Sequence, residues 1–209
     1  MKYKKYPRTF HLPFSKGSTS DDKFLKDYSN FENKDIIVTL KMDGENTTMY
    51  NDHIHARSLD YSYHESRDWI KQFHSSFKHD IPKNIRICGE NLYATHSLEY
   101  NNLLSYFYGF SIFENDTCLS WNNTLEWFEL FGIIPVEVIY EGVFDLNKLE
   151  QLSILLDSNK HEGFVVRLKD SFDYKDFNKS VAKYVRANHV TTNSHWMYQE
   201  IKVNKLGKI

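Results

Sequence analysis

Short strand-like runs recur along almost the whole of this 209-residue chain and constrain its fold more than any other feature. β-Branched and aromatic residues gather in short runs bounded by Gly, Asn, Asp or Ser, which is typical of strands. The runs that we expect to form strands are 36–41, 47–50, 54–58, 85–92, 106–113, 133–140, 163–169 and 181–186. Apolar spacing predicts helices over 65–78, 125–131 and 146–156, the second with Asn122 or Asn123 as its N-cap. Antiparallel-looking strands with few helices between them indicate an α+β fold: antiparallel sheets with flanking helices.

The chain ends carry weaker patterns. The first 30 residues are loop-like, with Pro7, Pro13 and the polar run 15–22. We expect residues 187–209 to form a short C-terminal tail that begins a helix near His195 and whose lysines either stay solvated or contact an RNA backbone. Without repeats or a Gly/Ser linker, residues 1–209 are predicted to form a single domain.

Charge and hydropathy exclude some classes of protein. The formal net charge is −2, so the chain is not a polycation, and binding to nucleic acid would need a local basic patch. No stretch approaches the roughly 18 apolar residues of a membrane span, and the N-terminus has no signal-peptide pattern. We therefore expect a cytoplasmic protein with no membrane partner.

The sequence 41–46, Lys-Met-Asp-Gly-Glu-Asn, lies where a strand is predicted to run into a turn. A lysine nucleophile needs its pKa lowered from about 10.4, by partial burial or by cationic neighbours. A strand end can supply both to Lys41. Asp43 and Glu45 would alternate with Lys41 and could orient a ribose or a metal, while Gly44 permits close backbone approach. Standing alone, this motif is weak and favours a charged hairpin turn.

Further candidates follow in order along the chain. They are Arg57, Glu90 in Cys-Gly-Glu-Asn, Phe107 in the aromatic run 106–110, Glu162 in Glu-Gly-Phe-Val-Val-Arg, and Lys183 in Val-Ala-Lys-Tyr-Val-Arg. Strand alternation puts Glu90 on the face of Arg86 and Cys88, opposite Ile85 and Ile87. The ordered set resembles the covalent nucleotidyltransferase superfamily of ATP-dependent ligases and mRNA capping enzymes, most closely its RNA ligase family.

The resemblance implies a nucleotidyltransferase (ATP-grasp-like) domain of ligases and an RNA ligase that uses ATP and Mg²⁺ or Mn²⁺. Lys41 would form lysyl-AMP, pass the AMP to an RNA 5′-phosphate, and a 3′-hydroxyl would then seal the strands, as in RNA repair. Such in-line displacements at phosphorus depend mostly on positioning and charge neutralisation.

The resemblance also implies a role for each matched residue. Lys41, Lys183 and Glu162 would be catalytic, with Lys183 neutralising the α-phosphate. The ATP site would comprise Lys41, Asp43, Asn46, Arg57, Glu90, Phe107 and Lys183. Glu162 and Asn46 would hold the metal, directly or through water. Phe107 would stack on adenine, whereas Phe110 faces the other way and is expected in the core. The stretch 15–18, with Arg8 and His11 upstream, either forms a surface loop or closes over the nucleotide.

Two departures from the family pattern leave alternatives open. The second lysine expected after Lys183 is Val185, and Arg186 points away from the Lys183 face, so its contact with phosphate or RNA is unsettled. No stretch is long enough for an OB-fold, which predicts a catalytic domain without that appendage and a possible helper protein or domain that supplies RNA affinity. The alternatives are a DNA ligase, a GTP-dependent capping-type enzyme, or a catalytically dead nucleotide- or RNA-binding module.

Overall fold

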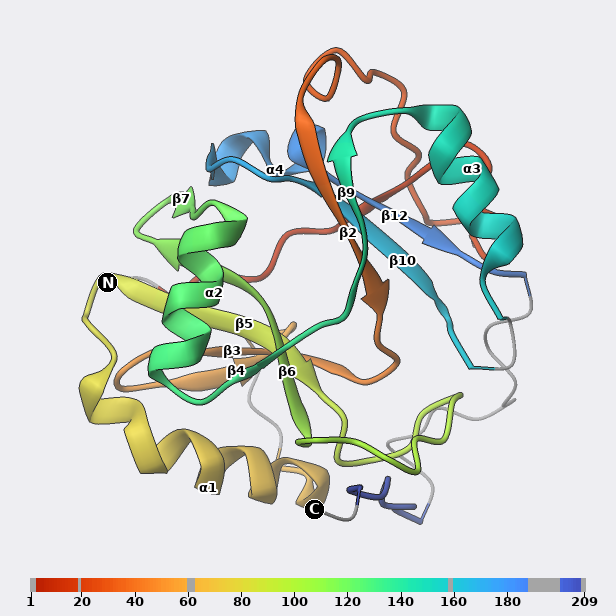
Figure 1. The fold of residues 1–209 in the computed structure, drawn as a ribbon. Helices are drawn as coiled ribbons and strands as arrows, with labels where there is room; N and C mark the ends of the chain where they lie inside the picture. Colours follow the sequence, from red (N-terminus) through yellow and green to blue (C-terminus); the bar gives the residue numbers. More distant parts are fainter. Residues whose placement is uncertain (1–2, 19, 60–62, 158–159, 188–199, 208–209) are drawn as a thin grey trace.

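The computed structural model describes residues 3–18, 20–59, 63–157, 160–187 and 200–207. In this part of the chain two β-sheets are flanked by short helices (Figure 1). The strands are β1 (Phe10–His11), β2 (Asp35–Lys41), β3 (Glu45–Met49), β4 (Ile54–Ala56), β5 (Ile85–Asn91), β6 (Phe107–Glu114), β7 (Thr117–Cys118), β8 (Ile134–Pro135), β9 (Val138–Val143), β10 (Gly163–Leu168), β11 (Phe172–Asp173) and β12 (Val181–Val185). The helices are α1 (Asp68–Phe77), α2 (Trp121–Leu130), α3 (Leu146–Leu155) and α4 (Phe177–Ser180), with 3-10 turns η1 (Glu65–Arg67), η2 (Lys78–Asp80) and η3 (Tyr174–Asp176).

The first sheet has the order β1-β12-β10-β2-β9 and the second the order β11-β7-β6-β5-β3-β4, with β8 beside β6. All neighbours are antiparallel except β1 with β12 and β8 with β6. The α+β prediction is confirmed. The hairpin interpretation of the turn after Lys41 is wrong, because β2 and β3 belong to different sheets and the turn 42–44 carries the chain from one to the other.

Alternation along β2 separates a core face from a cleft face. Ile36 and Val38 join the buried cluster that contains Leu149 of α3, so α3 covers the outer face of the first sheet. Thr39 and Lys41, which point the other way, line a cleft. Burying one face on α3 therefore aims the opposite face, and the predicted nucleophile, into the space between the sheets.

Alternation along β5 works in the same way for the second sheet. Ile85 and Ile87 belong to the cluster with Ile70 of α1 and Phe128 of α2, whereas Cys88 belongs to the cluster of the first sheet. The predicted faces of this strand are confirmed. Helices α1 and α2 thus cover the outer face of the second sheet (Figure 1).

Most of the helix predictions are close to the structure, but α2 begins earlier than expected. Its N-cap is Ser120, whose side chain accepts a hydrogen bond from the Asn123 N–H, so neither Asn122 nor Asn123 caps the helix. The predicted helix near His195 lies outside the described residues. Across the part of the chain that the structure describes, the helices are all too short and too polar to cross a membrane.

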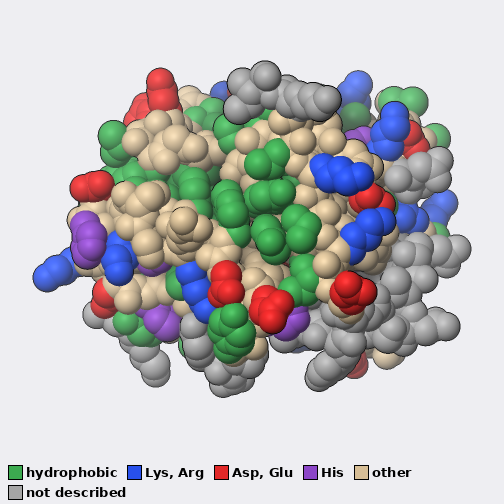
Figure 2. Space-filling model, turned by 90° about the horizontal axis from the view of Figure 1, so that it is seen from below, with side chains coloured by type: hydrophobic (Ala, Val, Ile, Leu, Met, Phe, Trp, Pro, Cys, Tyr) green, Lys and Arg blue, Asp and Glu red, His purple; other side chains and the backbone are tan. Residues whose placement is uncertain are grey.

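Aromatic side chains pack against one another along α1 and α2. Trp69 stacks on Phe73 with ring centroids 5.2 Å apart, Phe77 stacks on Phe131, and Phe131 stacks on Trp127. Figure 2 shows hydrophobic side chains gathered in the middle of the face seen from below, with charged side chains around them. Both buried clusters are rich in aromatic side chains, so the aromatic content goes largely into packing.

Candidate functional site

A cleft of about 580 Å³ lies between the two sheets. Nine of the residues that line it carry charged side chains and come from widely separated parts of the sequence. The charged residues of its lining are Arg8, Asp22, Lys41, Glu45, Arg57, Arg67, Glu90, Arg167 and Lys183 with His96, and apolar residues including Val136, Val165 and Phe110 complete it. A concave site with an apolar part and convergent polar groups is the usual form of a small-molecule site.

Strand register brings the cleft residues of the first sheet into a row. Val165 of β10 pairs with Thr39 on one side and with Lys183 on the other, and Gly163 pairs with Lys41. A Cβ on Gly163 would lie 1.9 Å from the carbonyl oxygen of Tyr184. Only glycine therefore lets β10 and β12 approach closely beside the predicted nucleophile.

Lys41, at the end of β2, is paired with Glu162, the residue before β10. Lys41 Nζ lies 2.5 Å from Glu162 Oε2, and the side chains are 25% and 9% exposed. Burial lowers the pKa of Lys41, but the carboxylates of Glu162 and Glu90 more than offset this, so the pKa lies above its ordinary value. The expectation that burial and cationic neighbours lower the pKa of Lys41 is wrong for the protein without nucleotide. In that form Lys41 is the protonated partner of an ion pair.

Glu90 and Asn46 lie opposite each other on neighbouring strands β5 and β3 of the second sheet, and both line the cleft. Burial raises the pKa of Glu90 to about 8, Lys41 lowers it, and the nearby carboxylates of Glu162 and Asp43 raise it further. Asn46 Oδ1 is buried and has no hydrogen-bond partner among the described residues. The carboxylates near Lys41 thus have little positive charge around them, and the amide oxygen of Asn46 has no hydrogen-bond partner among the described residues.

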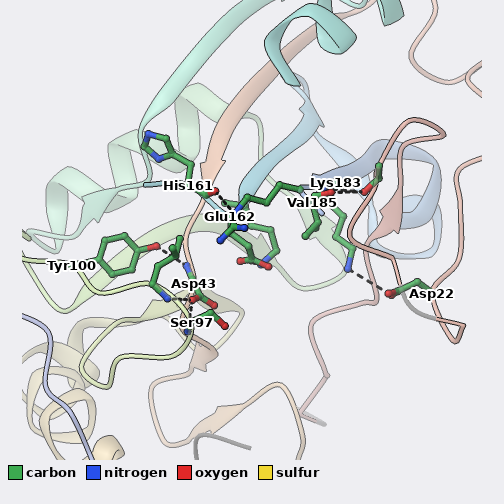
Figure 3. Close-up of polar contacts among 12 residues, drawn as sticks. Asp22, Asp43, Ser97, Tyr100, His161, Glu162, Lys183 and Val185 are labelled. Carbon is green, nitrogen blue, oxygen red and sulfur yellow. Dashed lines mark hydrogen bonds and ion pairs between the residues drawn. The ribbon is translucent and has the colours of Figure 1, made fainter. Parts of the chain in front are cut away.

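Asp43 and Glu45 do not continue the strand of Lys41 as expected. Asp43 Oδ2 accepts hydrogen bonds of 2.7 Å from the backbone N–H groups of Ser97 and Leu98, and Asp43 is not among the residues that line the cleft (Figure 3). The chain leaves β2 at Lys41, which breaks the alternation on which the prediction depended. Asp43 Oδ2 therefore fixes the turn, and a contact of Asp43 with a ribose or metal stays a prediction.

Glu45 is held by Arg67, which also lines the cleft. Arg67 Nε donates to Glu45 Oε2 at 2.8 Å, and Nη2 donates to Oε1, which makes a two-pronged ion pair. Both side chains are more than four-fifths buried. This pair connects η1 to the start of β3. Arg67 could not be predicted from the sequence, because only the fold brings it near Glu45.

Lys183 of β12 meets a carboxylate from the N-terminal segment. Lys183 Nζ lies 3.8 Å from Asp22 Oδ1 (Figure 3). The same oxygen lies 3.4 Å from His11 Nε2 and 3.6 Å from Arg8 Nη2. The segment reaches this place because β1 pairs with β12, and this pairing puts His11 opposite Lys183. Burial lowers the pKa of Lys183, while Asp22 raises it, and the net shift is downward. Arg8 and Asp22 thus line the cleft, whereas residues 15–18 do not, and closure of that stretch over a nucleotide stays a prediction.

The two arginines that the sequence singled out differ in their relation to the cleft. Arg57 follows β4, is exposed, and lines the cleft. Arg186 is not in the cleft lining: its backbone N–H donates to Glu162 O at 3.0 Å and its Nε to His161 O at 3.1 Å. Arg186 thus fastens the stretch that carries Glu162, a structural role that strand alternation alone did not indicate.

The prediction that Phe107 stacks on adenine is wrong. Its ring is fully buried among the residues that α1 and α2 cover, 6.0 Å from the ring of Phe73. Phe110, which was expected in the core, lines the cleft with Val165. The two rings do face opposite ways, but the amphipathic helix α1 covers the Phe107 face, so Phe110, which lines the cleft together with Tyr6, is an aromatic surface open to a ligand.

Comparisons with known proteins find a family and a set of similar folds. A family model described as RNA ligase matches residues 34–185, a range that contains the site residues from Lys41 to Lys183. A search of curated proteins finds no match to the sequence. The family match covers more than half of the chain.

Solved structures share the fold at low sequence identity. An archaeal ATP-dependent RNA ligase is 14% identical with a TM-score of 0.59, over 88% of this chain and 48% of its own. An Aquifex aeolicus protein assigned as an ATP-dependent DNA ligase is 15% identical, with a TM-score of 0.55, over 87% and 50%. A lysine-to-alanine variant of the Naegleria gruberi RNA ligase with ATP and Mn is 17% identical, with a TM-score of 0.52, over 89% and 61%. The chain thus spans about half the length of the structures that it resembles.

Proposed function

This chain belongs to the RNA ligase family, and from that premise we propose that it joins RNA ends with ATP through a lysyl-AMP intermediate on Lys41. One observation carries the proposal: Lys41 and Lys183, which lie far apart in the sequence, line one cleft, and Glu162 forms an ion pair with Lys41. Titratable groups with shifted pKa values in a cleft are typical of a reactive centre.

We propose that Lys41 attacks the α-phosphorus of ATP. The Nζ–P bond forms while the bond from phosphorus to the pyrophosphate oxygen breaks, and the lysine proton leaves before or during attack. Glu162 Oε2, 2.5 Å from Nζ, is the group in place to hold that proton. Lys183 and Arg57, both on the cleft, would neutralise the charge on the phosphates.

The later steps use the same cleft. The AMP would move from Lys41 to the 5′-phosphate of an RNA strand, and a 3′-hydroxyl would then attack that phosphate and release AMP. Both are in-line displacements at phosphorus, so the chain's contribution is positioning and positive charge. Arg8, at another part of the cleft wall and 43% exposed, is a further cation beside which the polynucleotide phosphates could lie.

The residues present fit a divalent cation, Mg²⁺ or Mn²⁺. Asn46 Oδ1 is buried without a partner among the described residues, and Glu162 lies close enough to Glu90 to add to the rise that burial causes in the pKa of Glu90. No group of three His, Cys, Asp or Glu side chains is placed as a cage in the described part, but Mg²⁺ usually keeps several waters and needs one or two carboxylates. Glu162 and Asn46 would hold the ion, which would supply positive charge to the triphosphate.

We propose Phe110 as the surface on which the adenine base stacks. It borders the cleft, with Val165 and Val136 as apolar neighbours in the same lining. An aromatic face stacks on any base, so it supplies affinity rather than a choice between adenine and guanine. Selection of ATP over GTP therefore stays a prediction to be measured.

A joining assay tests this function. The protein is incubated with a 5′-phosphorylated strand and a 3′-hydroxyl strand, as RNA or as DNA, with ATP or GTP and Mg²⁺ or Mn²⁺. We expect joined RNA with ATP, and none from a Lys41→Ala variant. Joining of DNA alone would indicate a DNA ligase, use of GTP a capping-type enzyme, and no product with any pair a binding module.

We also propose that a partner or a further domain supplies affinity for RNA. The solved structures that this chain resembles are about twice its length, and the formal net charge of −2 gives it no general attraction to phosphate backbones. We expect weak, strongly salt-dependent RNA binding by the protein alone. A tight complex at physiological salt would contradict this part of the proposal.

A further inference from the structure

The C-terminal segment 200–207 lies along loop 92–106, which connects β5 to β6 (Figure 1). Ala94 pairs with Val203 and Leu103 with Leu206 as isolated bridges. Five backbone hydrogen bonds of 2.7 to 3.0 Å join the two stretches. They are Thr95 N to Lys202 O, Asn204 N to Tyr93 O, Lys205 N to Tyr100 O, Leu103 N to Lys205 O and Gly207 N to Leu103 O.

Asn204 fixes this contact with its side chain, which is almost fully buried. Its Oδ1 accepts hydrogen bonds of 2.9 Å from Thr95 Oγ1 and from Tyr100 N. Its Nδ2 donates to Leu92 O at 2.8 Å and to Ala94 O at 3.4 Å. A buried amide with both ends satisfied holds its partners in one geometry, because any shift leaves a polar atom unpaired.

The same loop holds the turn that follows Lys41. Ser97 N and Leu98 N both donate to Asp43 Oδ2, and Asp43 N donates to Tyr100 Oη at 3.0 Å (Figure 3). Tyr100 therefore connects the two contacts, because its backbone binds Asn204 and its hydroxyl binds Asp43. A Cβ on Gly44 would lie 2.5 Å from Asn91 O, so the turn packs directly on the start of this loop.

We propose that segment 200–207 is a positioning element for the lysine nucleophile, with Asn204 as its principal residue. Asn204 sets loop 92–106, the loop sets Asp43, and Asp43 sets the turn that begins at Lys41. A displacement of about 1 Å in a reacting group can slow a reaction 100-fold, so this path can affect the chemistry without any contact to the nucleotide. The inference rests on the proposed function, namely adenylylation of Lys41.

The test uses the full chain and follows the single-turnover rate of covalent AMP labelling against ATP concentration. Asn204→Asp keeps the size of the side chain but loses both donated hydrogen bonds. We expect its maximal rate to fall by about tenfold, with a smaller change in the half-saturating ATP concentration. The amides of Ser97 and Leu98 should exchange hydrogen faster. Asn123→Asp, the same change on the exposed surface of α2, is the matched control and should behave as the wild type.

A double variant of Asn204 and Asp43 distinguishes a positioning role from a general effect on stability. If Asn204 acts through Asp43, the rate losses of Asn204→Asp and Asp43→Asn will not multiply in the double variant. Multiplying losses, or a wild-type labelling rate in Asn204→Asp, would overturn the inference. Should Asn204→Asp not fold, Thr95→Val and Thr95→Ser replace it: Val should slow labelling and Ser, which keeps the hydroxyl, should restore it. Equal rates for that pair would overturn the inference too.

The two proposals fail in different ways. Absence of any covalent label on the wild-type protein would count against the proposed function. A normal label on the wild type together with unaffected rates in the variants would count against the positioning role alone.

Discussion

Lys41 Nζ lies 2.5 Å from Glu162 Oε2, so the proposed nucleophile is held as the cationic half of an ion pair. Burial lowers the pKa of Lys41, but the neighbouring carboxylates raise it further, and an amine must lose its proton before it attacks. The free protein is therefore in a resting state, and binding of a nucleotide with its cation must change the charge balance around Glu162 before Lys41 reacts.

Removal of the Glu162 carboxylate should lower the pKa of Lys41. We expect Glu162→Gln to move the acylation of Lys41 by an amine-selective reagent to lower pH, since only the neutral amine reacts. Peptide mass spectrometry without nucleotide or metal measures this, with Lys148 on α3 as the internal reference. A midpoint that is unchanged or moves to higher pH would contradict the account.

Glu90 should make stability depend on pH. Its pKa is raised by burial to about 8, against about 4.3 for an unfolded glutamate. The folded state then binds more protons between these values, so the free energy of unfolding falls as pH rises through that window. In metal-free buffer, Glu90→Gln should gain thermal stability over the wild type as pH rises from about 5 to 8, at about 2–4 °C per kcal/mol. Glu150→Gln, on the exposed surface of α3, is the control; a pH-independent difference for Glu90→Gln would contradict the prediction.

Phe110 and Phe107 should respond in opposite ways to substitution. Phe110→Ala removes the proposed stacking surface and should raise the half-saturating ATP concentration about 5- to 150-fold, as expected for loss of one base stack. Phe107→Ala opens a cavity in the packed side of the second sheet and should cost about 3–5 kcal/mol of stability. Labelling kinetics and thermal melts of both variants measure this. Weaker ATP binding in Phe107→Ala, with Phe110→Ala unaffected, would restore the assignment made from the sequence.

Asp22 should control the alkaline limb of the pH profile. Its carboxylate raises the pKa of Lys183, which burial lowers. Asp22→Asn should therefore let Lys183 lose its proton at lower pH, and the rate of AMP labelling at saturating ATP should decline earlier as pH rises. Lys183→Arg keeps a charge across this range and should remove the decline. Superimposable profiles of Asp22→Asn and the wild type would contradict the prediction.

The local features of the fold could be predicted from the sequence, because apolar periodicity reports which face of an element is buried. That reasoning placed β2, β5 and β10, and it put Lys41 at a strand end beside a turn. The same reasoning failed where packing between two elements far apart in the sequence decides which side chain is buried. Nothing in the run 106–110 shows that α1 covers the face of Phe107, and so the wrong aromatic residue was assigned to the cleft.

The ion pairs and the positioning contacts were beyond sequence reasoning for the same reason. Asp22 reaches Lys183 across 161 positions, and Asn204 reaches Tyr100 across 104, by pairings that only the folded chain creates. Asp43 was given a ligand role because its motif is compact, whereas the structure directs its carboxylate to the amides of the neighbouring loop.

The central claim is a covalent bond between AMP and Lys41, and label transfer tests it most directly. Purified protein is incubated with ATP labelled at the α-phosphate and a divalent cation, then separated under denaturing conditions beside Lys41→Ala and Lys148→Ala. We predict a labelled band for the wild type and for Lys148→Ala, none for Lys41→Ala, and release of the label by excess pyrophosphate. A label that persists in Lys41→Ala, or no label on the wild type with either Mg²⁺ or Mn²⁺, would contradict the account.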